Sequence, residues 1–173
     1  EKGRVLDFLE KMENPVTKAI NAGCYIFNSS VISEIPAGKV VSIERETFPQ
    51  LVKSSRPVFG YSEQSYWLDI GTPAALITAS QDLITKKLQS PATPENDGKA
   101  LIAPDVTMGK STKIAGGSVI SKGVVIGENC EIIGSIIFAG AKIADNCRII
   151  NGIVAPNSQI AANTVATSEI IGY

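Results

Sequence analysis

The sequence contains no histidine among its 173 residues. Without an imidazole, the chain cannot form a Ser-His-Asp or Cys-His catalytic arrangement, and it has no histidine to bind a metal. Three cysteines are present, Cys24, Cys130 and Cys147, but they form neither a CxxC pair nor a zinc-ligand spacing. These absences exclude the commonest nucleophilic and zinc-dependent sites.

The sequence also lacks a strong net charge and a long apolar run. Its net charge is −1, so we expect no electrostatic attraction to nucleic acid or to an anionic membrane. No stretch of about 18 apolar residues is present, which predicts no transmembrane helix. The chain begins EKGRVLDF, without an initiator methionine or the apolar core of a signal peptide. Together with the unpaired cysteines, this beginning predicts part of a longer, cytoplasmic protein.

A loop-forming segment, QSPATPENDGK at residues 89–99, divides the sequence into two parts. Its two prolines and its Gly, Asn, Asp and Ser are typical of a linker. We therefore predict a first domain over residues 1–88, a linker over 89–100 and a second domain over 101–173.

The first part contains short runs that are typical of strands. These runs lie at residues 4–10, 22–27, 59–61 and 66–70. Helical segments lie between and after them, and strands mixed with helices indicate an α/β layer. So few strands in 88 residues predict half of a sheet rather than a whole one.

Two helices are predicted in the same part. Residues 42–52 have the pattern of an amphipathic helix, which Ser42 can cap. A second helix is predicted to begin at Thr72-Pro73 and to run to about Leu88. Thr72 can cap it, and a proline at the first helical position loses no hydrogen bond.

After the linker, aliphatic residues recur every six positions, with one five-residue step in each later turn. They begin at Ile102, Met108 and Ile114 and continue in three columns with a 17-residue repeat: Ile120, Ile137, Val154 and Ile171; Ile126, Ile143 and Ile160; Ile132, Ile149 and Ala166. Three columns with one period indicate a three-sided coil with one inward apolar residue on each face. We therefore predict a parallel β-helix of several coils.

The cysteines fit this architecture as small apolar residues. Cys130 and Cys147 are also 17 positions apart, which places them at equivalent points of successive coils. We expect them to face the interior, with a metal or redox role as the alternative. Cys24 lies in an apolar run and is expected in the core of the first domain.

Three runs in the first part together resemble the sugar-1-phosphate nucleotidyltransferases: VLDFLEKM at residues 5–12, NAGCYIF at 21–27 and YWLDIGTP at 66–73. SIERETFPQL at 42–51 is most similar to the GDP-mannose pyrophosphorylase (mannose-1-phosphate guanylyltransferase) branch. In those enzymes a hexapeptide β-helix follows the catalytic domain. The resemblance therefore implies the carboxyl-terminal, sugar-binding half of a Rossmann-like catalytic domain, followed by a left-handed β-helix.

The resemblance also implies a reaction. The phosphate of a sugar 1-phosphate attacks the α-phosphorus of a nucleoside triphosphate, and a nucleotide-sugar and pyrophosphate form with Mg²⁺ as cofactor. Such a reaction brings two anions together, so the protein must neutralise and position them. The first choice is GDP-mannose from mannose 1-phosphate and GTP. Glucose 1-phosphate with dTTP, UTP or ATP is the alternative.

The resemblance assigns roles to charged residues of this sequence. Asp69 is implied to bind Mg²⁺, a hard cation that takes oxygen ligands, with a solvated turn aspartate as the alternative. Lys11 is implied to contact the sugar-linked phosphate, and Glu10 to accept hydrogen bonds from sugar hydroxyls. An exposed ion pair is the alternative for these two. The sequence departs from the family at Met12, where proline is usual.

Asn21 and Gly23 are the remaining candidates for substrate binding. The Asn21 amide can donate to and accept from a sugar, and Gly23 lets a ligand approach the backbone. A plain turn residue is the alternative for Asn21.

Other functions stay open. The glycine-rich loop that binds the nucleotide in this family has no counterpart in the sequence, so we expect the chain alone to be inactive. A non-catalytic regulatory homologue is therefore one alternative. Acyltransferases also use hexapeptide β-helices, but they generally rely on a histidine base, which is lacking here. The flat faces and open last coil of the β-helix predict a homo-oligomer.

Overall fold

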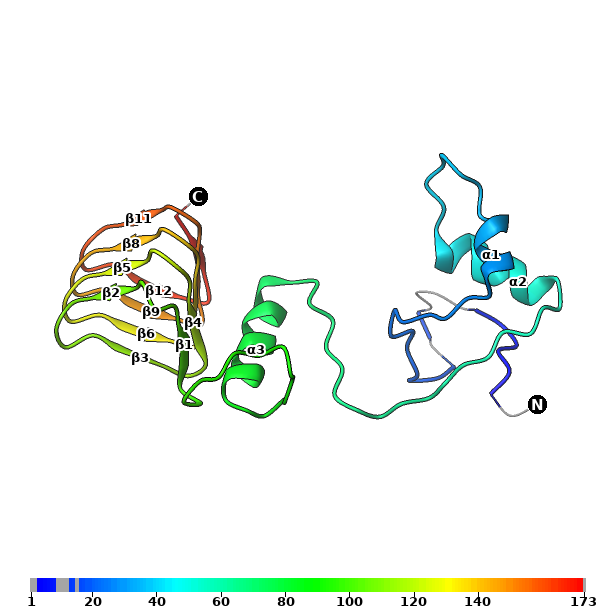
Figure 1. The fold of residues 1–173 in the computed structure, drawn as a ribbon, viewed down its shortest axis with the longest axis horizontal. Coiled ribbons are helices and arrows are strands. Elements are labelled where there is room, and N and C mark those ends of the chain that lie inside the picture. The colour runs from blue at the N-terminus through cyan, green and yellow to red at the C-terminus, as the bar shows by residue number, and fades with distance from the viewer. Residues whose placement is uncertain (1–2, 9–12, 15, 173) are drawn as a thin grey trace. The chain divides into compact units, whose positions relative to one another are not determined.

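In a computed structural model, the chain forms two compact units, Glu1–Trp67 and Leu68–Tyr173 (Figure 1). The structure describes residues 3–8, 13–14 and 16–172. None of the described helices has the length and apolar character needed to cross a lipid bilayer.

The second unit is built around three parallel sheets that wind as a solenoid (Figure 1). The five-stranded sheet has the order β1 (Ala100–Ile102), β4 (Ser118–Ile120), β7 (Ile136–Ile137), β10 (Ile153–Val154), β13 (Ile170–Ile171). The β2–β11 sheet contains β2 (Thr107–Met108), β5 (Val125–Ile126), β8 (Lys142–Ile143) and β11 (Gln159–Ile160). The β3–β12 sheet contains β3 (Lys113–Ala115), β6 (Glu131–Ile133), β9 (Arg148–Ile150) and β12 (Val165–Thr167). The solenoid has about four turns and is consistent with a left-handed β-helix, which confirms the predicted architecture.

The pairing register reproduces the 17-residue repeat of the sequence. Each predicted column is one line of paired residues: Ile120–Ile137–Val154–Ile171, Ile126–Ile143–Ile160 and Ile132–Ile149–Ala166. The first coil pairs with the second at a spacing of 18, as between Ile102 and Ile120. One column of inward side chains therefore belongs to each sheet.

The inward side chains of successive coils form one apolar core. Ile132, Ile137 and Ile149 are completely buried, and the burial of each stabilises the fold by roughly 1.5–3 kcal/mol. The first coil differs from the others. Ile102 and Met108 occupy the same columns but keep 37% and 46% of their surface exposed. No earlier coil covers them in the described part of the chain, and the end coils of a solenoid lack one neighbour.

The corners of the solenoid need unusual backbone conformations. Asn129, Asn146 and Asn163 follow one another at one corner with φ values of 54°, 58° and 65°. Asparagine tolerates this left-handed region better than most residues. Gly127 is required for a different reason, because an added Cβ would lie 2.8 Å from the backbone nitrogen of Asp145 in the next coil.

Helix α3 (Pro73–Ile84) begins as the sequence predicts. Thr72 Oγ1 accepts a hydrogen bond from the backbone N–H of Ala75 at 3.2 Å, and proline occupies the first helical turn. The helix ends at Ile84 rather than near Leu88. The cause is local, since Lys86 has a φ of 63° and so cannot continue a right-handed helix.

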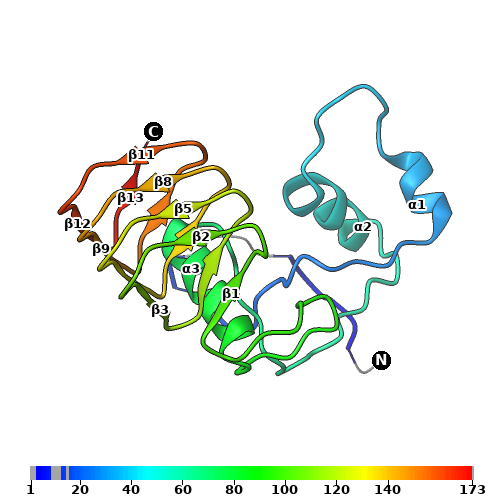
Figure 2. The same ribbon diagram turned by 60° about the vertical axis from the view of Figure 1, so that its left-hand side comes forward.

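Helix α3 packs on the outer face of the five-stranded sheet, within the second unit (Figure 2). Ile136 and Ile153 point away from the solenoid core, yet each is only 6% exposed. The Gln81 side chain donates from Nε2 to the Gly134 carbonyl and to Asn151 Oδ1, both at 3.0 Å. The helix is therefore attached to two successive corners of the solenoid.

The first unit contains three short helical segments: α1 (Ser29–Glu34), the π-helix η1 (Ile43–Thr47) and α2 (Phe48–Lys53). Together η1 and α2 occupy the predicted helix at residues 42–52, and the Ser42 hydroxyl caps it by accepting from the Arg45 N–H at 3.2 Å.

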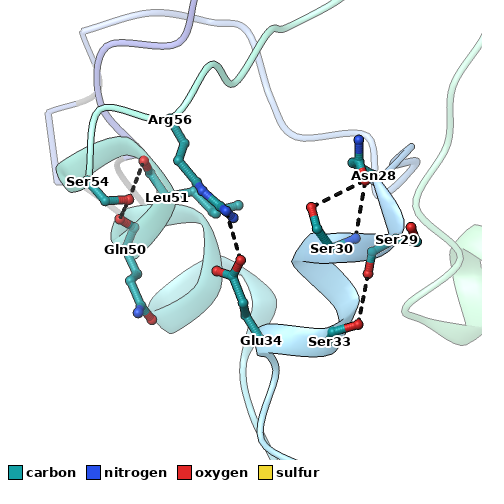
Figure 3. A network of polar contacts seen from close by, with 9 residues as sticks. All are labelled: Asn28, Ser29, Ser30, Ser33, Glu34, Gln50, Leu51, Ser54 and Arg56. Atoms are coloured by element: carbon teal, nitrogen blue, oxygen red, sulfur yellow. Dashed lines mark hydrogen bonds and ion pairs between the residues drawn. The ribbon is translucent and has the colours of Figure 1, made fainter.

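Polar contacts hold these segments in place (Figure 3). Asn28 caps α1 by accepting from the Ser30 N–H at 3.2 Å. An ion pair of 2.8 Å between Arg56 Nη2 and Glu34 joins α1 to the segment after α2.

In the described residues of the first part the predicted strands do not form, and residues 9 and 10 of the first run lie outside the described residues. Among the described residues, the only β-pairing there is an isolated antiparallel bridge between Arg4 and Phe59. The run at residues 22–27 pairs with no neighbour, and Ile26 is fully exposed. A strand needs neighbours for its backbone groups and an apolar face to cover. The runs at residues 22–27 and 66–70 have no β-partner among the described residues, and the runs around Arg4 and Phe59 meet only at that single bridge.

The solenoid makes a direct test of burial possible, because one column contains both a buried and an exposed isoleucine. We expect Ile137→Ala to lower the free energy of unfolding of the second unit by about 2–5 kcal/mol, since it leaves a cavity in the core. Ile102→Ala removes the same atoms from the exposed first coil and should cost less than half as much. Urea denaturation followed by circular dichroism measures both. Equal losses would contradict the structure.

The cysteines occupy two different environments. Cys130 and Cys147 are each 1% exposed, and their thiols donate to the carbonyl oxygens of Ala144 and Ala161 at 3.2 Å. Burial raises the pKa of the Cys147 thiol. No group of three metal-binding side chains occurs among the described residues. The burial of both thiols confirms the predicted inward positions. The prediction for Cys24 is wrong, because it is exposed beside an unpaired segment.

Thiol reactivity should separate these environments. Under native conditions a disulfide reagent such as DTNB is expected to modify Cys24 rapidly and to leave Cys130 and Cys147 unmodified, because only an accessible thiolate reacts. In denaturant all three should react. Cys24→Ser is the control and should abolish the fast phase. Fast reaction of two or three thiols in the native protein would contradict the buried positions.

Candidate functional site

The Asn21 side chain is the centre of a polar cluster in the first unit. Its Nδ2 donates to the Tyr25 hydroxyl and to Glu44 Oε1, both at 2.6 Å. Its Oδ1 accepts from the backbone N–H of Gly23 at 3.1 Å. The Tyr25 hydroxyl also donates to Glu44 Oε1, at 3.3 Å. Asn21 is therefore held from three sides.

Open space adjoins this cluster at Gly23. Its backbone has a φ of 75°, and a Cβ added there would meet no atom within 4 Å. Glycine is the residue that adopts this conformation without strain. The indole N–H of Trp67 donates to the carbonyl of Ala22 at 3.3 Å, which holds the turn from the other side. A ligand can thus reach the backbone beside Asn21.

Tyr25 connects the cluster to an aromatic core. Its ring lies 4.9 Å from that of Phe48, edge to face, and Phe48 is only 6% exposed. Phe8 stacks on Phe48 at a centroid distance of 4.9 Å, and Phe27 lies at 5.8 Å. Such aromatic pairs contribute about 0.5–1.5 kcal/mol beyond simple burial. These ring contacts therefore fix the position of the Tyr25 hydroxyl in the polar cluster.

Glu44 is positioned by the π-helix η1. The helix is fixed at its start by Ser42, whose backbone N–H donates to the Glu46 carboxylate at 2.9 Å. The backbone N–H of Thr47 donates to the Ser42 carbonyl at 3.3 Å, the five-residue spacing of a π-helix. Glu44 is half-buried and directs Oε1 to Asn21.

Asp69 belongs to the other unit, Leu68–Tyr173. It is exposed and lies three residues before Thr72, the cap of α3. Its carboxylate lies close to Gly71: a Cβ added to that glycine would be 3.3 Å from Asp69 Oδ2. Among the described residues it makes no hydrogen bond or ion pair, so both oxygens are available to a cation.

The structure brings some of the predicted site residues together. Asn21 and Gly23 share one turn and a hydrogen bond in the first unit. Asp69 lies in the second unit, and Glu10 and Lys11 lie outside the described residues. The proposed roles of these last three stay predictions.

Two members of the cluster were not predicted from the sequence. Glu44 lies in the helix predicted at residues 42–52 and Tyr25 in the strand predicted at 22–27, and neither was a candidate site residue. Their role depends on contacts across 23 and 4 residues, respectively, to the Asn21 amide. The one signal in the sequence is that both lie in runs that carry the family resemblance.

Comparison with known proteins places both parts of the chain. A model of the family described as "Nucleotidyl transferase" matches residues 1–86. A second model, described as "GMPPB C-terminal domain", matches residues 96–172. The chain belongs to the nucleotidyl transferase family, in a form with this carboxyl-terminal domain.

Individual relatives carry more specific names. The chain is 40% identical over 135 residues to the mannose-1-phosphate guanylyltransferase of Mycobacterium tuberculosis, covering 78% of this chain and 38% of that protein. It is 34% identical to the catalytic subunit beta of that enzyme from Drosophila pseudoobscura, over 66% of this chain and 32% of the relative. A putative mannose-1-phosphate guanyltransferase of Sulfolobus acidocaldarius is 29% identical, over 70% and 34%. The chain spans about a third of the length of these relatives.

Proposed function

We propose that the chain forms the sugar-handling part and the β-helix of an enzyme that makes GDP-mannose and pyrophosphate from mannose 1-phosphate and GTP. The observation that carries the proposal is the 40% identity to a mannose-1-phosphate guanylyltransferase over 78% of the chain. The polar cluster around Asn21, beside the open backbone of Gly23, supports it, because a sugar needs such groups for its hydroxyls.

In the proposed reaction, different residues of the chain bind the sugar hydroxyls and the sugar-linked phosphate. A phosphate oxygen of mannose 1-phosphate forms a bond to the α-phosphorus of GTP, and the bond from that phosphorus to the bridging oxygen breaks as pyrophosphate leaves. Lys11 would neutralise the sugar-linked phosphate, and Glu10 and Asn21 would accept hydrogen bonds from sugar hydroxyls. These contacts hold two anions in line, which is the main requirement of phosphoryl-type transfer.

Asp69 fits a magnesium ion as one of its ligands. Mg²⁺ prefers oxygen ligands and is commonly held by one or two carboxylates together with substrate phosphates. An exposed carboxylate without other partners among the described residues meets this requirement. Such an ion would supply positive charge that offsets the negative charge of the phosphates. Asp69 would hold it at the start of α3.

The role of Asp69 can be tested in the full-length enzyme that carries this chain. We expect Asp69→Asn to lower the rate of pyrophosphate release from mannose 1-phosphate and GTP by at least about 100-fold, because a preorganised charge at the phosphates is lost. The melting temperature should not change, since Asp69 is exposed. Asp105→Asn, at another exposed position, is the control and should keep full activity, because an asparagine oxygen can still accept from the Gly123 N–H that Asp105 binds at 2.9 Å. Unchanged turnover in Asp69→Asn would refute the assignment.

We further propose that the intact protein self-associates through the first coil of the β-helix. Ile102 and Met108 expose 37% and 46% of their surface, and strands β1, β2 and β3 each lie at the edge of their sheet. Exposed apolar groups next to unpaired strand edges favour contact with another chain. A second copy of the protein would cover both.

Sedimentation of the intact protein tests this contact. Met108→Lys should shift the distribution toward monomer, because a charge at the contact must be desolvated on association. Thr107→Lys places the same charge on the neighbouring, outward-facing position of β2 and serves as the control. A monomeric wild-type protein, or equal effects of the two variants, would rule out this surface.

A further inference from the structure

The Asn21 amide has no hydrogen-bond donor left for a ligand. A side-chain amide carries two N–H donors and one oxygen with two acceptor positions. Both donors are used, on the Tyr25 hydroxyl and on Glu44 Oε1 at 2.6 Å. The oxygen accepts one bond, from the Gly23 N–H at 3.1 Å. What Asn21 can offer a ligand is therefore the second acceptor position of Oδ1.

Glu44 fixes this polarity. A reversed amide would direct its NH₂ group at the Gly23 N–H and its oxygen at the Glu44 carboxylate, so both contacts would become repulsive. The carboxylate accepts from Nδ2 in a charge-assisted bond, which is roughly twice as strong as a neutral one. Glu44 Oε1 is itself held by the Tyr25 hydroxyl at 3.3 Å. The cluster thus has one stable arrangement.

We propose that Glu44 is a positioning residue of the sugar site, which orients the Asn21 amide so that its oxygen accepts a hydroxyl group of the sugar. The inference rests on the proposed function and deepens it. The cluster presents acceptor oxygens and a negative charge, so it binds the hydroxyl donors of a sugar and repels its phosphate. Glu44 therefore also contributes to the direction in which a sugar 1-phosphate enters the site.

The first experiment observes Asn21 directly, without enzyme activity. In nitrogen-15 NMR spectra of this chain, Glu44→Ala should move the two Asn21 side-chain N–H resonances toward the positions of a solvated amide and speed their exchange with water. Glu44→Gln keeps an acceptor and should give an intermediate shift. Glu46→Ala, on the same helix, removes the Ser42 contact and is the control for loss of helix structure.

The second experiment measures kinetics in the full-length enzyme. Glu44→Ala should raise the KM for mannose 1-phosphate about 10-fold, the effect of losing about one hydrogen bond to the sugar, and leave the KM for GTP unchanged. Glu44→Gln should recover part of the loss. The double variant Asn21→Ala/Glu44→Ala should be no worse than Asn21→Ala alone, because Glu44 acts through Asn21.

The outcomes separate the two proposals. If Glu46→Ala moves the Asn21 resonances as much as Glu44→Ala does, or if the KM values of both substrates rise equally, the positioning role is wrong. Additive losses in the double variant would also overturn it. If the wild-type enzyme releases no pyrophosphate with mannose 1-phosphate and GTP, the proposed function fails, and the NMR result still decides whether Glu44 orients Asn21.

Discussion

The second unit depends on the close stacking of one coil on the next. Each turn must bring an aliphatic side chain to the same inward position and must let the backbone of the following turn approach. The paired columns through Ile137 and Ile149 meet the first requirement, and Gly127 meets the second, because any Cβ there would collide with the next coil. The three sheets and the outer face that receives α3 follow from this spacing.

The first unit has no comparable constraint. Among its described residues, the runs with strand-like composition pair only at the bridge between Arg4 and Phe59. The regular structure there consists of short helices, and a polar cluster links η1 to the turn at Asn21. Its aromatic contacts centre on Phe48, and the Asn21 cluster is attached to that centre through Tyr25. The candidate sugar site is therefore positioned by side-chain contacts and by η1, not by a sheet.

What could be predicted from the sequence follows the same division. The inward columns and the start of α3 were predictable because a fixed period and a Thr-Pro cap are local signals. The strands at residues 22–27 and 66–70 and the burial of Cys24 were wrong, because a strand exists only when a neighbour supplies its hydrogen bonds. Asn21 and Gly23 were named from the chemistry of their residue types within a run that carries the family resemblance. Glu44 was missed as their partner, because a contact between residues 23 positions apart produces no repeating pattern in the sequence.

The attachment of Gln81 to the corners at Gly134 and Asn151 has a consequence for how the parts of such an enzyme communicate. Helix α3 begins four residues after Asp69, so the carboxylate that we propose as a metal ligand is connected to the solenoid through this helix. A displacement of two corner turns by a neighbouring subunit would be transmitted along a helix of 12 residues to that carboxylate. If the β-helix assembles and Asp69 binds the metal as proposed, the two properties would be coupled through α3.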